Sequence, residues 1–222
     1  MKMAYAPLNL CLELPEDSVT SLILEQPKFY YDFITDIYGQ ISGSSGTVYF
    51  SDTDSSFSMT KSAVLLSQFI PFETNQKPLQ NALYAKMKKA AQDEEFFLSA
   101  HELSSQIETF IHSLAGRFDE EIIWDHPDDI TLLLKAVSVR FFDKQPDLQS
   151  QVLDYMLACR SYLGKRLFIT VNLRSYLGEQ EAEALYRSVV LHKITMLCIE
   201  NREYKHISHE KRLIIDEDLC VI

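Results

Sequence analysis

Carboxylates concentrated in one short link are the residues of this sequence best placed to do chemistry. Six of them fall within eleven positions, in a stretch without helical or strand periodicity. Calcium prefers several oxygen ligands in a flexible geometry, so such a link could fold around one or more hard cations. A two-metal nuclease would use a similar set of side chains. The residues of this acidic link are Asp119, Glu120, Glu121, Asp125, Asp128 and Asp129.

The same carboxylates have an equally direct structural explanation. Asp125, Asp128 and Asp129 flank Pro127, which stands where a helix can begin. Carboxylates at a helix start cap free N–H groups and interact favourably with the helix dipole. The residues alone therefore leave cation binding and helix capping both open.

Basic residues form a second, weaker pattern. Lys86, Lys88 and Lys89 lie on a predicted helix, where Lys86 and Lys89 share one flank. Asp93 stands four residues after Lys89 on that flank, so ion pairing along the helix competes with phosphate binding as the explanation. The remaining basic residues of interest are Lys135, Arg140, Lys144, Lys165 and Arg166.

Several motifs of enzymes and metal proteins are missing or incomplete. The glycine-rich turn at 43–47 has no lysine and leads into a predicted strand, whereas a phosphate loop needs a lysine and a following helix. The acidic turn at Asp52 lacks the glycine and the final glutamate of an EF-hand. His206 and His209 with Glu210 match neither zinc-protease order, and no G-x-S-x-G serine motif occurs. We expect no bound nucleotide and no hydrolase of these kinds.

The composition is that of an ordinary folded protein. Hydrophobic residues make up 46% of the 222 positions and charged residues 24%. The four cysteines are far apart and form no C-x-x-C pair, which favours a reducing cytoplasm. No apolar run has the length of a membrane span, and the first residues lack the pattern of a signal peptide. We expect a cytoplasmic protein without membrane contact.

The elements that must position these side chains change in type twice along the chain. Residues 19–25 and 47–50 are predicted strands on either side of a helix that begins at Pro27, and this spacing indicates a parallel unit. Apolar residues then recur at helical spacing up to about Leu163, and Asp147 and Gly164 mark the start and end of the last of these helices.

The last part of the chain returns to alternating strands and helices. Strands are predicted at 167–171 and 196–199, with a helix at 179–192 between them. The simplest arrangement is an α/β head made from both ends of the chain, because each half alone is too small to bury a good core. We expect three segments: 1–75 as the first part of the head, 76–163 as an α-helical leg, and 164–222 as the second part of the head.

Five segments of the chain carry a resemblance to one protein family. They are 18–40, 128–140 (DDITLLLKAVSVR), 165–172 (KRLFITVN), 194–202 (ITMLCIENR) and 213–221 (LIIDEDLCV). The matches are individually moderate, and they extend in order over nearly the whole chain. These segments resemble the ring-forming, DNA-end-binding adaptation protein of type II-A CRISPR systems, which is encoded beside the RNA-guided effector nuclease and the integrase.

This resemblance implies a fold and a function. The fold would be an α/β head with a mostly parallel sheet, similar to a P-loop ATPase without the phosphate loop, and an α-helical leg insertion. The protein would be a homotetrameric ring that encloses double-stranded DNA without sequence preference, prefers free ends and is stabilised by calcium. It would act without catalysis in spacer acquisition, together with the CRISPR integrase complex and the RNA-guided effector nuclease.

The resemblance also assigns roles to the acidic and basic residues. Calcium would bind at Glu121, Asp125, Asp128 and Asp129, although an inserted His126-Pro127 breaks the family's acidic alternation. The candidate DNA contacts are Lys86, Lys89, Lys135, Arg140 and Lys144.

The formal net charge of −11 opposes general nucleic-acid binding. A ring answers this objection, because four copies of a few lysines concentrate positive potential in one lumen. Two other hypotheses stay open: a metal-dependent nuclease that uses the carboxylates at 119–129, and a degenerate ATPase-like interaction module with no role on DNA.

Overall fold

The chain folds into two compact units. The computed structural model describes residues 1–52, 57–125, 129–143 and 145–222. One unit, here called the head unit, combines Met1–Thr74 with Asp143–Ile222, and the other, the helical unit, is Asn75–Phe142. Both ends of the chain therefore belong to the head unit, and the helical unit is inserted between them.

The head unit contains two sheets with helices packed on them. Its elements in chain order are β1 (Lys2–Tyr5), η1 (Ala6–Leu8), β2 (Leu10–Glu13), β3 (Val19–Leu24), α1 (Pro27–Ile41), β4 (Val48–Ser51), α2 (Met59–Ser62), β5 (Ala63–Leu66), α6 (Leu148–Leu163), β6 (Leu167–Val171), η2 (Leu173–Ser175), α7 (Glu179–Leu191), β7 (Thr195–Glu200) and β8 (Glu210–Ile215). The helical unit holds α3 (Lys77–Ala91), α4 (Glu94–Ala115) and α5 (Ile130–Ala136).

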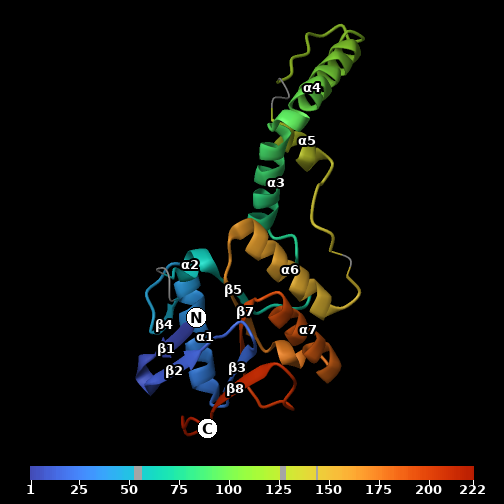
Figure 1. The fold of residues 1–222 in the computed structure, drawn as a ribbon. Coiled ribbons are helices and arrows are strands. Elements are labelled where there is room, and N and C mark those ends of the chain that lie inside the picture. The colour runs from blue at the N-terminus through green and yellow to red at the C-terminus, as the bar shows by residue number, and fades with distance from the viewer. Residues whose placement is uncertain (53–56, 126–128, 144) are drawn as a thin grey trace. The chain divides into compact units, whose positions relative to one another are not determined.

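A five-stranded parallel sheet forms the core of the head unit. Its strand order is β5-β6-β7-β3-β8, and every pairing within it is parallel. Every residue of β3, β6 and β7 is buried, which explains why these strands are mostly apolar in the sequence. In Figure 1, α1 lies on one face of this sheet, and α6 and α7 lie on the other.

The predicted start of α1 and the predicted end of α6 are confirmed. Gln26 caps α1 by accepting from the N–H of Phe29, and Pro27 occupies the first helical position, where its missing N–H costs nothing. Gly164 ends α6 with a φ of 65°, a left-handed conformation that glycine adopts without steric cost.

The strand β4 does not belong to the parallel sheet as expected. It pairs antiparallel with β1, in a separate three-stranded sheet of order β2-β1-β4. The ring of Tyr5 on β1 contacts Phe29 and Phe33 of α1, with ring centroids 5.7 Å and 5.3 Å apart. The small sheet is thereby attached to α1. The next strand of the parallel sheet after α1 is β5, which pairs with β6 and not with β3.

The boundary of the helical segment also differs from the expected range of 76–163. The helical unit ends at Phe142, and α6 belongs to the head unit, where it packs against α7. Four residues of α6 are buried there: Val152, Tyr155, Met156 and Cys159. None of the helices within the described ranges is long and apolar enough to cross a membrane.

Removing the cap of α6 should destabilise the head unit. The carboxylate of Asp147 accepts from the N–H of Ser150 at 2.8 Å. We expect Asp147→Ala to lower the free energy of unfolding by about 1 kcal/mol. Asp147→Asn keeps a capping oxygen and should stay within a few tenths of a kcal/mol of wild type. Urea denaturation of both variants checks this, and equal losses in the two would show that capping is not the cause.

Candidate functional site

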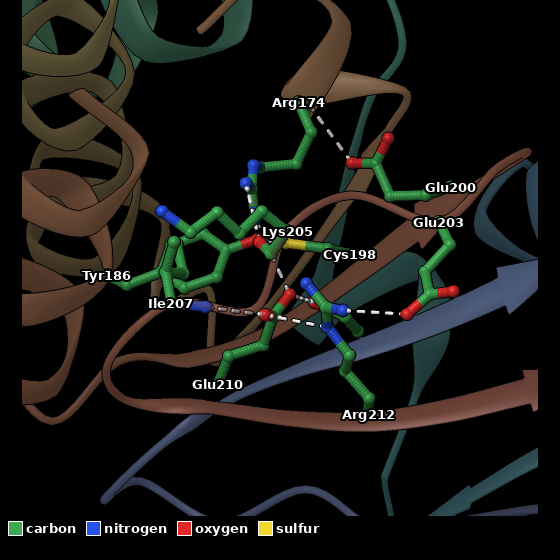
Figure 2. A network of polar contacts seen from close by, with 10 residues as sticks. Arg174, Tyr186, Cys198, Glu200, Glu203, Lys205, Ile207, Glu210 and Arg212 are labelled. Atoms are coloured by element: carbon green, nitrogen blue, oxygen red, sulfur yellow. Dashed lines mark hydrogen bonds and ion pairs between the residues drawn. The ribbon is translucent and has the colours of Figure 1, made fainter. Parts of the chain in front are cut away.

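A buried polar network joins the end of β6 to the connection between β7 and β8. Its central residue is Arg174 on η2, which directly follows β6 and is 5% exposed. The backbone N–H of Arg174 donates to Oε1 of Glu200 at 3.1 Å, and its guanidinium donates to the carbonyl of Lys205 at 3.3 Å. The guanidinium also lies 3.6 Å from the carboxylate of Glu210 (Figure 2).

Glu210 is the acidic partner that holds this network together. It begins β8, and its carboxylate accepts from the hydroxyl of Ser21 at 2.7 Å and from the N–H of Ile207 at 3.3 Å. The guanidinium of Arg212 contacts the same carboxylate at 2.8 Å and reaches Glu203 at 3.2 Å. These contacts fasten the connection at 201–209 to the parallel sheet (Figure 2).

Glu200 is the residue of this network whose protonation depends on its surroundings. It ends β7 and is 2% exposed, and burial raises the pKa of its carboxyl to about 7 although Arg174 lowers it in part. Its Oε2 has no hydrogen-bond partner among the described residues. The structure assigns this residue to a buried structural network.

The glycine-rich turn at 43–47 holds a carboxylate of its own chain. Asp36 Oδ2 accepts from the N–H and hydroxyl of Thr47 at 2.8 Å and 2.7 Å, and from the N–H of Val48 at 3.2 Å. These donors are the groups that a phosphate would need in a nucleotide site. The Asp36 carboxylate already occupies them.

The candidate DNA contacts lie in the helical unit where the structure describes them. Lys86 and Lys89 are on α3, Lys135 is on α5, and Arg140 follows α5; all four are exposed. Lys144 lies outside the described residues. The basic residues Lys165 and Arg166 are in the head unit, where they bind the carbonyl of Thr60 and the carboxylate of Asp52.

The candidate calcium ligands are not gathered around one point within the described residues. Glu121 and Asp125 are exposed, and Asp128 lies outside the described part of the chain. Asp129 caps α5, because its Oδ1 accepts from the N–H of Thr131 at 2.9 Å. Among residues 1–52, 57–125, 129–143 and 145–222, no three His, Cys, Asp or Glu side chains are grouped as a metal site would require.

Asp129 also forms an ion pair that the sequence did not indicate. The ammonium of Lys88 lies 3.0 Å from its Oδ2, and each side chain is 43% exposed. Hydrogen bonds from Thr131 and from Lys88 hold the pKa of Asp129 at about 2. In this conformation both carboxylate oxygens have partners within the chain.

Apolar side chains form a long exposed stripe on α4. The helix has 22 residues, and none of them is buried. Phe96, Leu103, Phe110 and Leu114 recur along one side and are between 38% and 68% exposed. The amphipathic pattern predicted a helix, but it gave no sign that the chain would leave the apolar side partly exposed. The first turns of this side line an apolar pocket together with α3 and α5.

Stability should depend on pH through Glu200. A carboxyl whose folded-state pKa is raised from 4.5 to about 7 favours the folded state when it is protonated. Its contribution is fully present below about pH 4.5 and is lost as the pH rises through 7, by roughly 3 kcal/mol. In Glu200→Gln this change should disappear. The difference in free energy of unfolding between variant and wild type, measured in urea from pH 5 to pH 8, should shift by that amount; a constant difference would contradict it.

Comparisons with known proteins agree with this fold. A search of curated proteins found no match to the chain. Among solved structures, the crystal structure of Stu0660 of Streptococcus thermophilus matches with a TM-score of 0.57 at 13% identity, over 91% of this chain and 69% of that one. At this identity the likeness shows the fold alone.

A family model gives the assignment. The model of the CRISPR-associated protein family Cas_Csn2 matches residues 40–219, which is most of the chain and includes both units. The protein therefore belongs to the Cas_Csn2 family of CRISPR-associated proteins.

Proposed function

We propose that this protein is a non-catalytic accessory protein of CRISPR adaptation, which binds double-stranded DNA ends without sequence preference as a homotetrameric ring. Membership of the Cas_Csn2 family supplies the link to CRISPR systems. The observation that carries the assembly is the partly exposed apolar stripe of α4. The integrase complex and the RNA-guided effector nuclease are the partners that this role implies.

The stripe on α4 has the spacing of a helix-pairing seam. Apolar residues alternate at intervals of four and three, which places them at the a and d positions of a heptad repeat. Such a seam packs against another helix, and within the described chain α4 leaves it half exposed. A second copy offers the same seam, so self-association covers both and supplies one of the interfaces that a tetramer needs. The seam residues are Phe96, Ala100, Leu103, Ile107, Phe110 and Leu114.

Assembly would also reconcile DNA binding with an acidic chain. The exposed Lys86, Lys89, Lys135 and Arg140 belong to the same helical unit as the seam. Copies brought together by α4 would place several sets of these four basic residues near one another, although each chain carries a net charge of −11. These side chains would then contact the phosphates of the duplex without reading its bases.

We propose further that calcium binds the acidic link and supports the assembly. Glu121, Asp125, Asp128 and Asp129 would supply oxygen ligands of the kind that calcium prefers. Because Asp129 is paired with Lys88 in this structure, calcium has to displace that ammonium in order to reach the carboxylate. The ion would neutralise these carboxylates and so reduce their repulsion between copies.

The head unit would serve as a scaffold. Its parallel sheet would have the layout of a P-loop ATPase sheet without the phosphate loop, and the N–H groups of Thr47 and Val48 at the end of the glycine-rich turn already hold the Asp36 carboxylate. We propose that the head binds no nucleotide.

Substitution of the seam should break the assembly. We expect wild type in calcium to have four times the 25.6 kDa mass of the chain, and a Leu103→Glu/Phe110→Glu variant to fall to a lower mass because carboxylates cannot be buried in the seam. Leu98→Glu is the control, since Leu98 is 72% exposed on another side of α4. Light scattering measures the masses. A monomeric wild type with and without calcium, or a control that dissociates like the seam variant, would refute this.

DNA binding should require an end and should fall steeply with salt. Phosphate contacts release counterions, so the logarithm of affinity should fall linearly with the logarithm of salt concentration. Reversing the charges of Lys135, Arg140 and Lys144 together should weaken binding and leave the tetramer intact. Fluorescence anisotropy with linear and relaxed circular DNA of one sequence, at several salt concentrations, tests both points. Equal affinity for linear and circular DNA would show that binding needs no free end. DNA cleaved during incubation with magnesium or manganese would favour a nuclease instead.

A further inference from the structure

A cavity in the helical unit lies beside the ion pair of Lys88 and Asp129. Its volume is about 280 Å³, and its lining comes from α3, α4 and the first residue of α5. The lining residues that matter chemically are Lys88, Gln92, Phe97, His101, Ser104 and Ile130. None of the described residues proposed to bind calcium or DNA lines this cavity.

The chemistry of the lining suits an anion with an attached ring. An ammonium, an imidazole, an amide and a hydroxyl line the cavity, and no carboxylate of the described residues does so. This is unusual in a chain with 32 acidic and 21 basic residues. The rings of Phe97 and His101 meet edge to face with centroids 4.4 Å apart, and Phe97 is half exposed. Aromatic rings of this kind accept any nucleobase, because every base has a π face.

Lys88 can be recruited to a ligand at little cost. Its partner Asp129 is as exposed to solvent as Lys88 itself, and ion pairs exposed to this degree contribute little to stability. A phosphate offers the ammonium a charge-assisted hydrogen bond of the stronger kind. Asp129 therefore competes with a bound phosphate for Lys88.

We propose that this cavity binds the terminal nucleotide of a DNA strand, with Lys88 on its 5′-phosphate and the rings of Phe97 and His101 beside its base. The volume is just below the roughly 300–1,000 Å³ of small-molecule sites, so it takes one nucleotide and excludes a duplex. The inference rests on the proposed function, and it specifies which part of a DNA end the protein recognises.

The first test compares DNA ends in the presence of a chelator, so that calcium plays no part. Duplexes carry one unpaired 5′ nucleotide with either a phosphate or a hydroxyl, and anisotropy gives the affinities. Wild type should prefer the phosphate about tenfold, Lys88→Gln should lose the preference, and Asp129→Asn should increase it severalfold because Lys88 is released while the cap of α5 remains. Lys77→Gln removes the same charge from the first residue of α3, outside the cavity, and should change nothing. Equal affinity of wild type for both ends, or a preference retained by Lys88→Gln, overturns the proposal.

The second test separates this inference from the proposed function. Thymidine 5′-monophosphate and inorganic phosphate are titrated into the protein alone, and the NMR resonances of the Phe97 and His101 rings are followed. The proposal expects both rings to shift with the nucleotide at lower concentration than with phosphate, and expects Lys88→Gln to weaken the response. A Lys88-dependent response in a protein that binds no linear duplex would support the cavity and refute the proposed function. An absent ring response, or equal affinity for nucleotide and inorganic phosphate, refutes nucleotide binding whatever the duplex result.

Discussion

The position of β3 between β7 and β8 is the constraint on which the rest of the structure depends. An amino-terminal strand pairs on both sides with strands from the last part of the chain, so the parallel sheet cannot form until nearly the whole chain is present. The helical unit is consequently an insertion into a domain that its two flanks complete together. Because β8 lies on the far side of β3 from β7, the connection at 201–209 has to pass β3 to reach the start of β8. This connection contains no helix.

The buried network around Arg174 and Glu210 fixes the connection at 201–209 to the sheet. Arg174 and Glu210 have side chains that are 4% and 2% exposed, and a pair at this depth gains stability only when its remaining hydrogen-bonding groups are satisfied. Glu210 meets that condition through Ser21, Ile207 and Arg212. Arg174 meets it only in part, because its Nε and Nη1 have no hydrogen-bond partner among the described residues. Removal of either member would leave the other charge buried alone, which is strongly destabilising.

Much of the head could be predicted from sequence, and the reasons are physical. Strands buried on both faces are continuous apolar runs, so β3, β6 and β7 were identifiable, and Asp147 and Gly164 marked the ends of α6 through local backbone chemistry. The strands β1 and β2 were not predicted, because each has four residues with a mixed burial pattern and no distinct periodicity. Pairings between distant single residues, such as Arg174 with Glu210 or Lys88 with Asp129, leave no pattern in a sequence. The position of Glu200 at a strand end was identifiable, but its raised pKa depends on burial that only the fold creates.

The features from which we propose a function belong to the helical unit. The apolar seam of α4, the exposed lysines and the cavity beside Lys88 all belong to this one compact unit. The measurement that tests the account most directly is the native mass of the complex with one short duplex, determined in calcium by mass spectrometry under non-denaturing conditions. The account predicts four chains around one duplex. One chain per duplex, with no larger species, would contradict it.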